Sequence, residues 1–162
     1  MPVKTPRDSQ VQMQEMVLPQ HINPQSTIFG GVVMSWVDIA ASMCAGKHCR
    51  LPVVTVHVDE LSFLAPIKMG HYVTILASLN YVGNTSMEIG VKVISENPRN
   101  GVTCTTTTAY LTFVALDELG RPCKVPPLKV ETKEEKRRFE NAKKRVEHRK
   151  QLRGQLNKKK ND

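Results

Sequence analysis

The residues best suited to chemistry lie between positions 21 and 42, where an Asn-Pro turn leads into two glycines and then into a helical pattern. One carboxylate, Asp38, falls about two turns into that pattern and has mostly apolar neighbours. Burying an unpaired charge costs several kcal/mol, so this acid is expected to be paired, protonated or functional. A carboxylate in such surroundings can act as a general base on water if a substrate carbonyl lies within reach. The alternative is a structural acid that bonds to Ser35, Ser42 or a loop amide.

Two further groups stand close to the start of the same helical pattern. Gly30 and Gly31 would let a substrate approach the backbone closely, and the free N–H groups of a first helical turn can stabilise an oxyanion. Close packing of helix on sheet would explain the same glycine pair. Asn23, in the preceding turn, can orient a water molecule or cap its own loop, as asparagine before proline commonly does.

The remaining polar motifs carry weaker chemical signals. His21 can serve as a base or as a packing residue in its loop. The other histidines and the four cysteines have no ligand-like spacing, so we expect no metal site. One tight turn offers amides and hydroxyls that can bind a phosphate, although hairpin turns without a ligand have the same composition; it consists of Gly83, Asn84, Thr85 and Ser86.

Hydrophobic periodicity indicates the elements that must position these groups. A helix is expected over about 29–47, with Asp38 in a narrow sector that it shares with small residues only: Gly31, Ser35, Ser42 and Gly46. The rest of its circumference is apolar, and a helix that is apolar nearly all round belongs in a core. Alternating, β-branched segments predict strands at 11–18, 53–63, 71–81, 86–96 and 102–116.

This order of elements predicts an α+β fold, in which a single curved antiparallel sheet wraps around one long buried helix. Short turns join most of the strands, and no internal repeat is present. Such a sheet covers the helix on one side and leaves an edge strand open. Pairing with a second copy of the chain is therefore expected.

Charge divides the 162-residue chain into a body and a tail. The net charge is +8, and residues 129–162 hold fourteen Lys/Arg against six Asp/Glu, so the whole excess lies there. We expect a flexible N-terminus over 1–10, one domain over 11–128 and a basic helical extension over 129–162. The extension helix should begin near Thr132, which can cap it, and should end near Gln151, with disorder after Gly154.

Composition also bears on the compartment. The four cysteines contain no CxxC pair and are expected to be reduced, mostly structural thiols. The first residues lack the apolar core of a secretory signal, and the run 29–45 is too short and too polar for a confident membrane span. We therefore expect a soluble cytoplasmic protein.

Several motifs, in order along the chain, resemble the hotdog-fold acyl-CoA thioesterases. They are IFGG followed by SW-x-D, then VVTVHVDELSFLAPIKMGH, GNTSMEIGVKV and LTFVALDELGRPCKVP. The resemblance is strongest to the group that contains the bacterial broad-specificity enzyme and the cytosolic brain acyl-CoA hydrolase, and it spans roughly residues 11–150. It implies a hotdog fold and the hydrolysis of acyl-CoA to free fatty acid and coenzyme A. No metal or other cofactor is implied, since coenzyme A is part of the substrate.

The resemblance also implies roles for individual residues. Asp38 would be the general base on water, Asn23 would act from a neighbouring subunit, and the backbone N–H of Gly31 would polarise the thioester carbonyl. Coenzyme A would run along a strand and a turn, whose residues are Thr55, Val56, His57, Gly83, Asn84, Thr85 and Ser86. Side chains that can line the acyl tunnel are Trp36, Met34, Met43 and Phe63.

The expected partners are an acyl-CoA substrate and further copies of the chain, as a hotdog dimer and a trimer of such dimers. Neither nucleic acid nor a membrane is expected as a partner. Two other functions remain open at this point. One is a hotdog dehydratase acting on hydroxyacyl thioesters, for which His21 and Asp38 are the available pair. The other is a non-catalytic acyl-CoA-binding regulator with a basic arm, since the fold alone does not fix the function.

Overall fold

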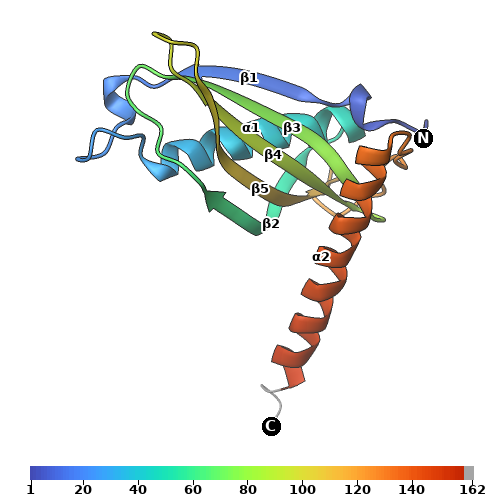
Figure 1. Cartoon of the computed structure of the whole chain (residues 1–162). Helices are drawn as coiled ribbons and strands as arrows, with labels where there is room; N and C mark the ends of the chain where they lie inside the picture. The colour runs from blue at the N-terminus through green and yellow to red at the C-terminus, as the bar shows by residue number, and fades with distance from the viewer. Residues whose placement is uncertain (159–162) are drawn as a thin grey trace.

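The computed structural model describes residues 1–158 of the chain. It contains one five-stranded antiparallel sheet with the order β1-β3-β4-β5-β2 (Figure 1). The strands are β1 (Val11–Met16), β2 (Val53–Phe63), β3 (Tyr72–Val82), β4 (Ser86–Glu96) and β5 (Thr103–Ala115). The helices are α1 (Gly30–Cys49) and α2 (Lys133–Lys158), with two short 3-10 turns, η1 (Pro6–Asp8) and η2 (Pro19–His21). The five predicted strands and the central helix are confirmed to within two residues at each end.

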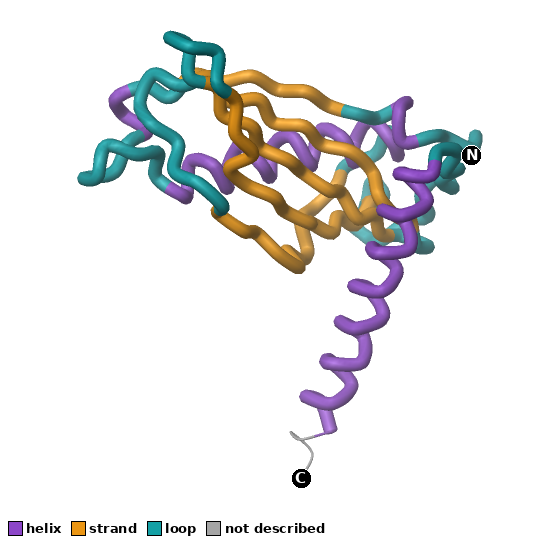
Figure 2. Tube along the Cα trace, viewed as in Figure 1, coloured by secondary structure: helices purple, strands orange, loops and turns teal. Residues whose placement is uncertain are grey.

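The sheet curves around α1, which is the arrangement that the resemblance to hotdog proteins implies. Loops and turns gather at the two ends of the sheet, and α1 runs along one of its faces (Figure 2). Alternate residues of each strand point to this face and form the core with the buried side of α1; on β3 these are Val73, Ile75, Ala77 and Leu79, which are at most 2% exposed. α1 ends at Cys49 and is followed by Arg50, which has a left-handed φ of 58° and lies two residues before Pro52.

The prediction that α1 is buried nearly all round is wrong for a single chain. Met34, Ile39 and Met43 are 47–49% exposed, because one sheet can cover only one side of a helix. The neighbouring strand β2 forms an edge of the sheet and also exposes apolar side chains, namely Val54, Val56 and Val58, at 41–49%. We call these six residues, which lie on the open side of α1 and on both faces of the edge strand β2, the apolar strip.

α2 lies on the face of the sheet opposite α1. Ala142 is fully buried, and the ring of Phe139 lies 5.1 Å from that of Tyr81. The predicted cap is confirmed, because Thr132 Oγ1 accepts a hydrogen bond from the N–H of Glu135 while the Glu135 carboxylate accepts one from the N–H of Thr132.

The predicted end of the C-terminal helix near residue 151 is wrong, since α2 continues to Lys158. Glycine costs only about 1 kcal/mol relative to alanine inside a helix, and good helix formers flank Gly154 on both sides. Residues 150–155 are all exposed, and this part of α2 extends away from the sheet (Figure 1). Residues 155–158 belong to α2 rather than to a disordered end, and the disorder predicted for 159–162 lies outside the described residues.

The N-terminal segment, expected to be flexible, makes specific contacts with the body. Lys4 Nζ donates to the carbonyls of Lys47 and His48 at the end of α1, where the helix dipole favours a cation. Ser9 is fully buried. No helix within residues 1–158 is long and apolar enough to cross a membrane, and all four cysteines are free thiols.

Candidate active site

The loop before α1 is organised by Asn23. Its Oδ1 accepts hydrogen bonds from the N–H groups of Gln25 (3.0 Å) and Thr27 (3.2 Å), and its Nδ2 donates to Thr27 Oγ1 at 3.0 Å. Within one chain Asn23 therefore does what the capping alternative predicted. Its amide nitrogen carries a second N–H that these contacts leave unused.

The first turn of α1 presents unused backbone donors. No side chain caps this end of the helix, and within residues 1–158 the N–H groups of Gly30 and Gly31 donate to no other protein group. Both glycines also lie close to aromatic rings: a Cβ on Gly31 would overlap the exposed ring of Phe29 unless that ring moved, and one on Gly30 would lie 3.3 Å from the ring of Phe63. The packing explanation and the oxyanion explanation of this pair are thus compatible.

Asp38 lies two turns further along α1, at the border between the core and the apolar strip. It is half-buried. Its Oδ1 accepts a 2.7 Å hydrogen bond from the hydroxyl of Thr55 on β2. The carboxylate is held by one short contact and keeps its second oxygen available, as a general base on water requires.

Asp38 and the Gly31 amide do not converge within one chain. Seven residues separate them on α1, which corresponds to about 10.5 Å along the helix axis. A carbonyl bound at the Gly31 N–H would lie beyond hydrogen-bond reach of a water held by Asp38 of the same chain. The strip that borders Asp38 is open, so the missing groups can come from a second copy.

His21, the other candidate base, faces its own loop. Its Nδ1 accepts a 3.1 Å hydrogen bond from the N–H of Leu18, and its ring meets that of Trp36 edge-on at 5.3 Å. No contact joins it to Asp38 in the described part of the chain. The pair that a dehydratase would use is therefore not assembled within one chain. Among residues 1–158 no group of three His, Cys, Asp or Glu side chains is placed to hold a metal ion.

An apolar cavity of about 340 Å³ adjoins the first turn of α1. It is open to solvent and is formed by the start of α1, the end of β2, the loop that follows β2 and one residue of β5; its lining consists of Ile28, Gly30, Val33, Phe63, Leu64, Ala65, Pro66, Ile67 and Thr107. Of the side chains expected to line an acyl tunnel, only Phe63 is among them. Trp36 is buried against His21, and Met34 and Met43 belong to the apolar strip.

The residues predicted to bind coenzyme A are brought together only in part. The strand register aligns Val54, Val114 and Ser86 in one row across β2, β5 and β4, so the turn at 83–86 lies two strand spacings, roughly 10 Å, from the start of β2. Backbone hydrogen bonds fix this turn. Val56 is exposed on the apolar strip.

His57 does not join this group. A bulge after Thr55 shifts the register of β2, and His57 Nε2 lies 3.4 Å from Asp59 Oδ1. Asp59 is bound by Arg149 of α2, so His57 belongs to the outer face of the sheet. A bulge changes which face the following residues occupy, and nothing in the alternation of the sequence announces it.

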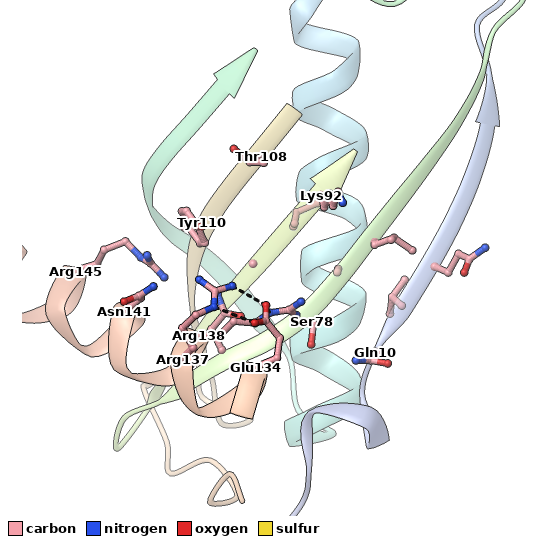
Figure 3. Close-up of a pocket in the computed structure, with 17 residues that line it drawn as sticks. Gln10, Ser78, Lys92, Thr108, Tyr110, Glu134, Arg137, Arg138, Asn141 and Arg145 are labelled. Atoms are coloured by element: carbon pink, nitrogen blue, oxygen red, sulfur yellow. Dashed lines mark hydrogen bonds and ion pairs between the residues drawn. The ribbon is translucent and has the colours of Figure 1, made fainter. Parts of the chain in front are cut away.

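A larger groove of about 580 Å³ lies between α2 and the outer face of the sheet (Figure 3). Lys92, Arg137, Arg138 and Arg145 contribute positive charge to it. Hydrogen bonds first from Arg137 and then from Arg138 lower the pKa of Glu134 to about 2. The sheet separates this groove from Asp38 and Gly31, so it is not part of the candidate active site.

Comparison with known proteins gives a consistent picture. Residues 25–102 match the thioesterase superfamily. The chain is 41% identical, over 80% of its length and 75% of the relative's, to the uncharacterized acyl-CoA thioester hydrolase YkhA of Bacillus subtilis. It is 34% identical, over 83% of its length, to the rat cytosolic acyl coenzyme A thioester hydrolase, of which it covers 36%.

Among solved structures, the acyl-CoA hydrolase of Staphylococcus aureus, in complex with butyryl coenzyme A, coenzyme A and coenzyme A disulfide, superposes with a TM-score of 0.89 at 36% identity. The match covers 98% of this chain and 96% of that one. A hexameric acyl-CoA thioesterase superposes with a TM-score of 0.90 at 36% identity, covering 94% of this chain and 97% of that one.

Three variants of the Staphylococcus aureus enzyme have also been solved, in which alanine replaces one asparagine, one aspartate or one threonine. The asparagine precedes the aspartate by 15 residues and the threonine follows it by 17, which are the spacings among Asn23, Asp38 and Thr55 in this chain. Sequence reasoning had placed Thr55 only beside coenzyme A. The sequence did contain a signal for the contact of Thr55 with Asp38. Thr55 lies two residues after Val53, so both side chains point to the α1 side of the sheet, where a polar residue is unexpected.

Proposed function

Because the chain belongs to the thioesterase superfamily, we propose that it hydrolyses acyl-CoA thioesters to a free carboxylic acid and coenzyme A, with Asp38 as the general base. The observation that carries this proposal is the half-buried Asp38 carboxylate, held on one oxygen by Thr55. Asn23 and Thr55 lie at the same sequence distances from Asp38 as the replaced asparagine and threonine lie from the replaced aspartate in the Staphylococcus aureus enzyme.

The proposed reaction uses water and groups of the protein itself. Asp38 accepts a proton from water while the water oxygen attacks the thioester carbonyl carbon. The resulting oxyanion receives hydrogen bonds from the Gly31 N–H, strengthened by the α1 dipole, and from Asn23 Nδ2. Collapse of this intermediate breaks the C–S bond, and the proton held by Asp38 passes to the departing thiolate. No metal or redox cofactor takes part in these steps.

We propose that each site is shared between two chains. Asp38 would come from one protomer, and Gly31 with Asn23 from its partner. The separation of about 10.5 Å between Gly31 and Asp38 along one helix supports this assignment. So does the unused N–H of Asn23, in the loop that leads into α1 and Gly31.

The apolar strip supplies a surface for this pairing. β2 is an edge strand, and edge strands present unpaired backbone groups that a second strand can complete. A two-fold interface would bury the same strip on both chains. Six exposed aliphatic and methionine side chains next to a carboxylate fit such an interface better than they fit solvent. The similar hexameric thioesterase supports a trimer of these dimers as the complete assembly.

Coenzyme A is proposed to lie along the start of β2 and to reach the turn at 83–86, whose hydroxyls and amides suit its nucleotide end. His57 is left out of this proposal because it lies beside Asp59 on the outer face. A cytoplasmic location is proposed from the similarity to the cytosolic rat hydrolase.

The test measures the hydrolysis of acyl-CoAs of different chain lengths. A disulfide reagent that reacts with the released coenzyme A thiol monitors the reaction. The wild-type protein should release coenzyme A, and Asp38→Ala should lower turnover by at least ~10²-fold, the scale of losing a general base. Glu60→Gln, which changes another acidic residue without touching Asp38, is the matched control. Circular dichroism and Tm would establish that both variants are folded. Undiminished turnover in Asp38→Ala would refute the proposal, and enoyl formation from 3-hydroxyacyl-CoA in the ultraviolet would favour a dehydratase.

A further inference from the structure

The apolar cavity beside the first turn of α1 has the size of a small-molecule site. Its volume of about 340 Å³ lies at the lower end of the ~300–1,000 Å³ that such sites commonly have. Apart from Thr107, all of its lining residues are aliphatic, aromatic, proline or glycine. A cavity of this composition that opens to solvent suits a hydrocarbon group, because the transfer of apolar surface out of water is favourable.

Backbone hydrogen bonds fix the walls of this cavity. The N–H of Ile28 donates to the carbonyl of Ile67 at 2.8 Å. The N–H of Leu64 donates to the carbonyl of Thr106, also at 2.8 Å. These bonds tie the loop after β2 to the segment before α1 and to β5. The cavity is therefore formed without a ligand, and binding requires little reordering of the protein.

Phe63, the last residue of β2, is the largest side chain of the lining. It pairs with Thr107 across β2 and β5, and paired residues on antiparallel strands point to the same face of the sheet. Its ring lies over the first turn of α1, since the ring tip would be 3.3 Å from a Cβ on Gly30. The side chain is 54% exposed, so a ligand that enters the cavity can contact it.

The cavity begins next to the proposed site of the thioester carbonyl. Gly30 forms part of its wall, and Gly31 holds the N–H that is proposed to bind the carbonyl oxygen. The exposed ring of Phe29 lies against Gly31 and does not belong to the cavity lining. Two routes are thus available to an acyl chain attached to the carbonyl: past Phe63 into the cavity, or past Phe29. The first route offers a preformed apolar cavity.

We propose that the acyl chain follows the route into the cavity, and that the ring of Phe63 limits the length of the chain that the enzyme accepts. This inference rests on the proposed thioesterase function and deepens it by assigning a specificity-determining residue. Met34 of the apolar strip lies four residues after Gly30 and hence on the same side of α1. Removing the ring would therefore extend the cavity towards the strip, where a longer chain finds further apolar surface.

The experiment compares kcat/KM for butyryl-CoA, octanoyl-CoA and dodecanoyl-CoA in the wild type, Phe63→Ala and Phe29→Ala. The ratio of dodecanoyl-CoA to butyryl-CoA should rise about tenfold or more in Phe63→Ala, since a single methylene that fits or does not fit a hydrophobic pocket changes kcat/KM by roughly 10–200-fold. Phe29→Ala is the matched control, because its ring is comparably exposed, at 59%, and lies on the other route. It should keep the wild-type ratio.

Ala65→Leu tests the cavity without changing Phe63. Ala65 lines the cavity from the loop after β2, so a leucine there fills part of it and should lower kcat/KM for the two longer substrates relative to butyryl-CoA. Phe63→Leu, which keeps an apolar side chain, should give a ratio between those of the wild type and Phe63→Ala, even if the alanine variant folds poorly. Circular dichroism and Tm would establish that the variants are folded.

Binding of S-alkyl-CoA thioethers separates recognition of the chain from catalysis. These analogues have no thioester carbonyl and are not hydrolysed, and isothermal titration calorimetry gives their Kd. In each variant the preference for S-dodecyl-CoA over S-butyl-CoA should change in the same direction as the ratio of kcat/KM values.

Unchanged ratios in both Phe63→Ala and Ala65→Leu would show that the acyl chain does not enter the cavity. A higher ratio in Phe29→Ala without one in Phe63→Ala would place the chain on the other route. Either result overturns the inference, while hydrolysis by the wild type would leave the proposed function standing. If the wild type neither hydrolyses the three acyl-CoAs nor binds the thioethers, the proposed function and this inference fail together.

Discussion

The hydroxyl of Thr55 donates a 2.7 Å hydrogen bond to Oδ1 of Asp38, joining the edge strand β2 to the central helix α1. This contact fixes the orientation of the carboxylate relative to the sheet. It leaves the other carboxylate oxygen without a hydrogen bond to the described residues. If Asp38 is the general base as proposed, Thr55 positions this base through the hydrogen bond.

Replacing Thr55 by valine should reduce kcat about three- to tenfold with little change in KM, because the carboxylate loses one hydrogen bond while the binding surface keeps its shape. Thr55→Ser should restore most of kcat. Steady-state kinetics on a single acyl-CoA would measure both parameters. If KM rose and kcat did not change, Thr55 would instead contribute to substrate binding.

Much of the fold could be predicted from local pattern. The period of two in the β segments and the glycine-rich start of the helix determine the five strands and α1, because alternation and turn chemistry are local properties. The helical periodicity of the sequence also predicts that Asp38 lies in a narrow polar sector of α1. The apolar remainder of α1 could not be divided into core and strip from the sequence, since both parts have the same composition and only the sheet distinguishes them.

Two features of the strands could not be predicted from the sequence. The resemblance places His57 in the same coenzyme A segment as Thr55, whereas a bulge between the two residues moves His57 to the other face of the sheet. Thr107 was one of four consecutive threonines, typical of a pleated surface. Only its phase with Ala109 and Leu111 distinguishes the buried hydroxyl from its neighbours, and its lack of a hydrogen-bond partner among the described residues is a tertiary property.

The sharing of sites between chains can be tested by mixing inactive variants. In a dimer that pairs an Asp38→Ala chain with an Asn23→Ala chain, one site carries both substitutions and the other carries neither. Random assortment would place half of the chains in such mixed dimers, so about a quarter of the sites should be fully active by two-fold symmetry. Co-expression with two different affinity tags would give the mixed dimer in pure form. Activity no higher than the mean of the two parents would show that both residues act within one chain.

α2 should contribute to stability through a buried ion pair. Glu88 is 1% exposed, and Arg145 binds it with two nitrogens, at 2.6 and 3.2 Å, while its guanidinium lies 3.7 Å from the centre of the Tyr110 ring. Arg145→Met would leave this carboxylate buried and unpaired, at a cost of about 3 kcal/mol in the free energy of unfolding. Urea unfolding would measure the loss.

Two further variants make the ion-pair test specific. Arg145→Met combined with Glu88→Gln should recover more than half of the lost stability, because the buried charge is then removed. Arg137→Met, which breaks an exposed ion pair on the same helix, should change stability little. Equal losses from Arg145→Met and Arg137→Met would mean that the buried position of Glu88 has no consequence.

His48 should make the fold less stable as the solution becomes acidic. The side chain is fully buried, its Nε2 lies 2.8 Å from the carbonyl oxygen of Pro126, and its Nδ1 has no partner among the described residues. Burial is the main cause that lowers the pKa of His48 below its usual 6.5, with a smaller contribution from Lys4; the Pro126 carbonyl and Asp8 act in the opposite sense. The unfolded chain then binds more protons than the folded one, so stability is complete above about pH 6.5 and falls as the pH drops towards the folded pKa.

Tm measured from pH 7.5 to pH 5 should therefore decline more steeply in the wild type than in His48→Gln, which can still donate to Pro126 but does not titrate. For a chain of this length each kcal/mol corresponds to about 2–4 °C in Tm. His148→Gln, on the exposed face of α2, is the control and should follow the wild-type curve. Parallel curves for the wild type and His48→Gln would show that the buried imidazole is protonated as readily in the folded chain as in the unfolded one.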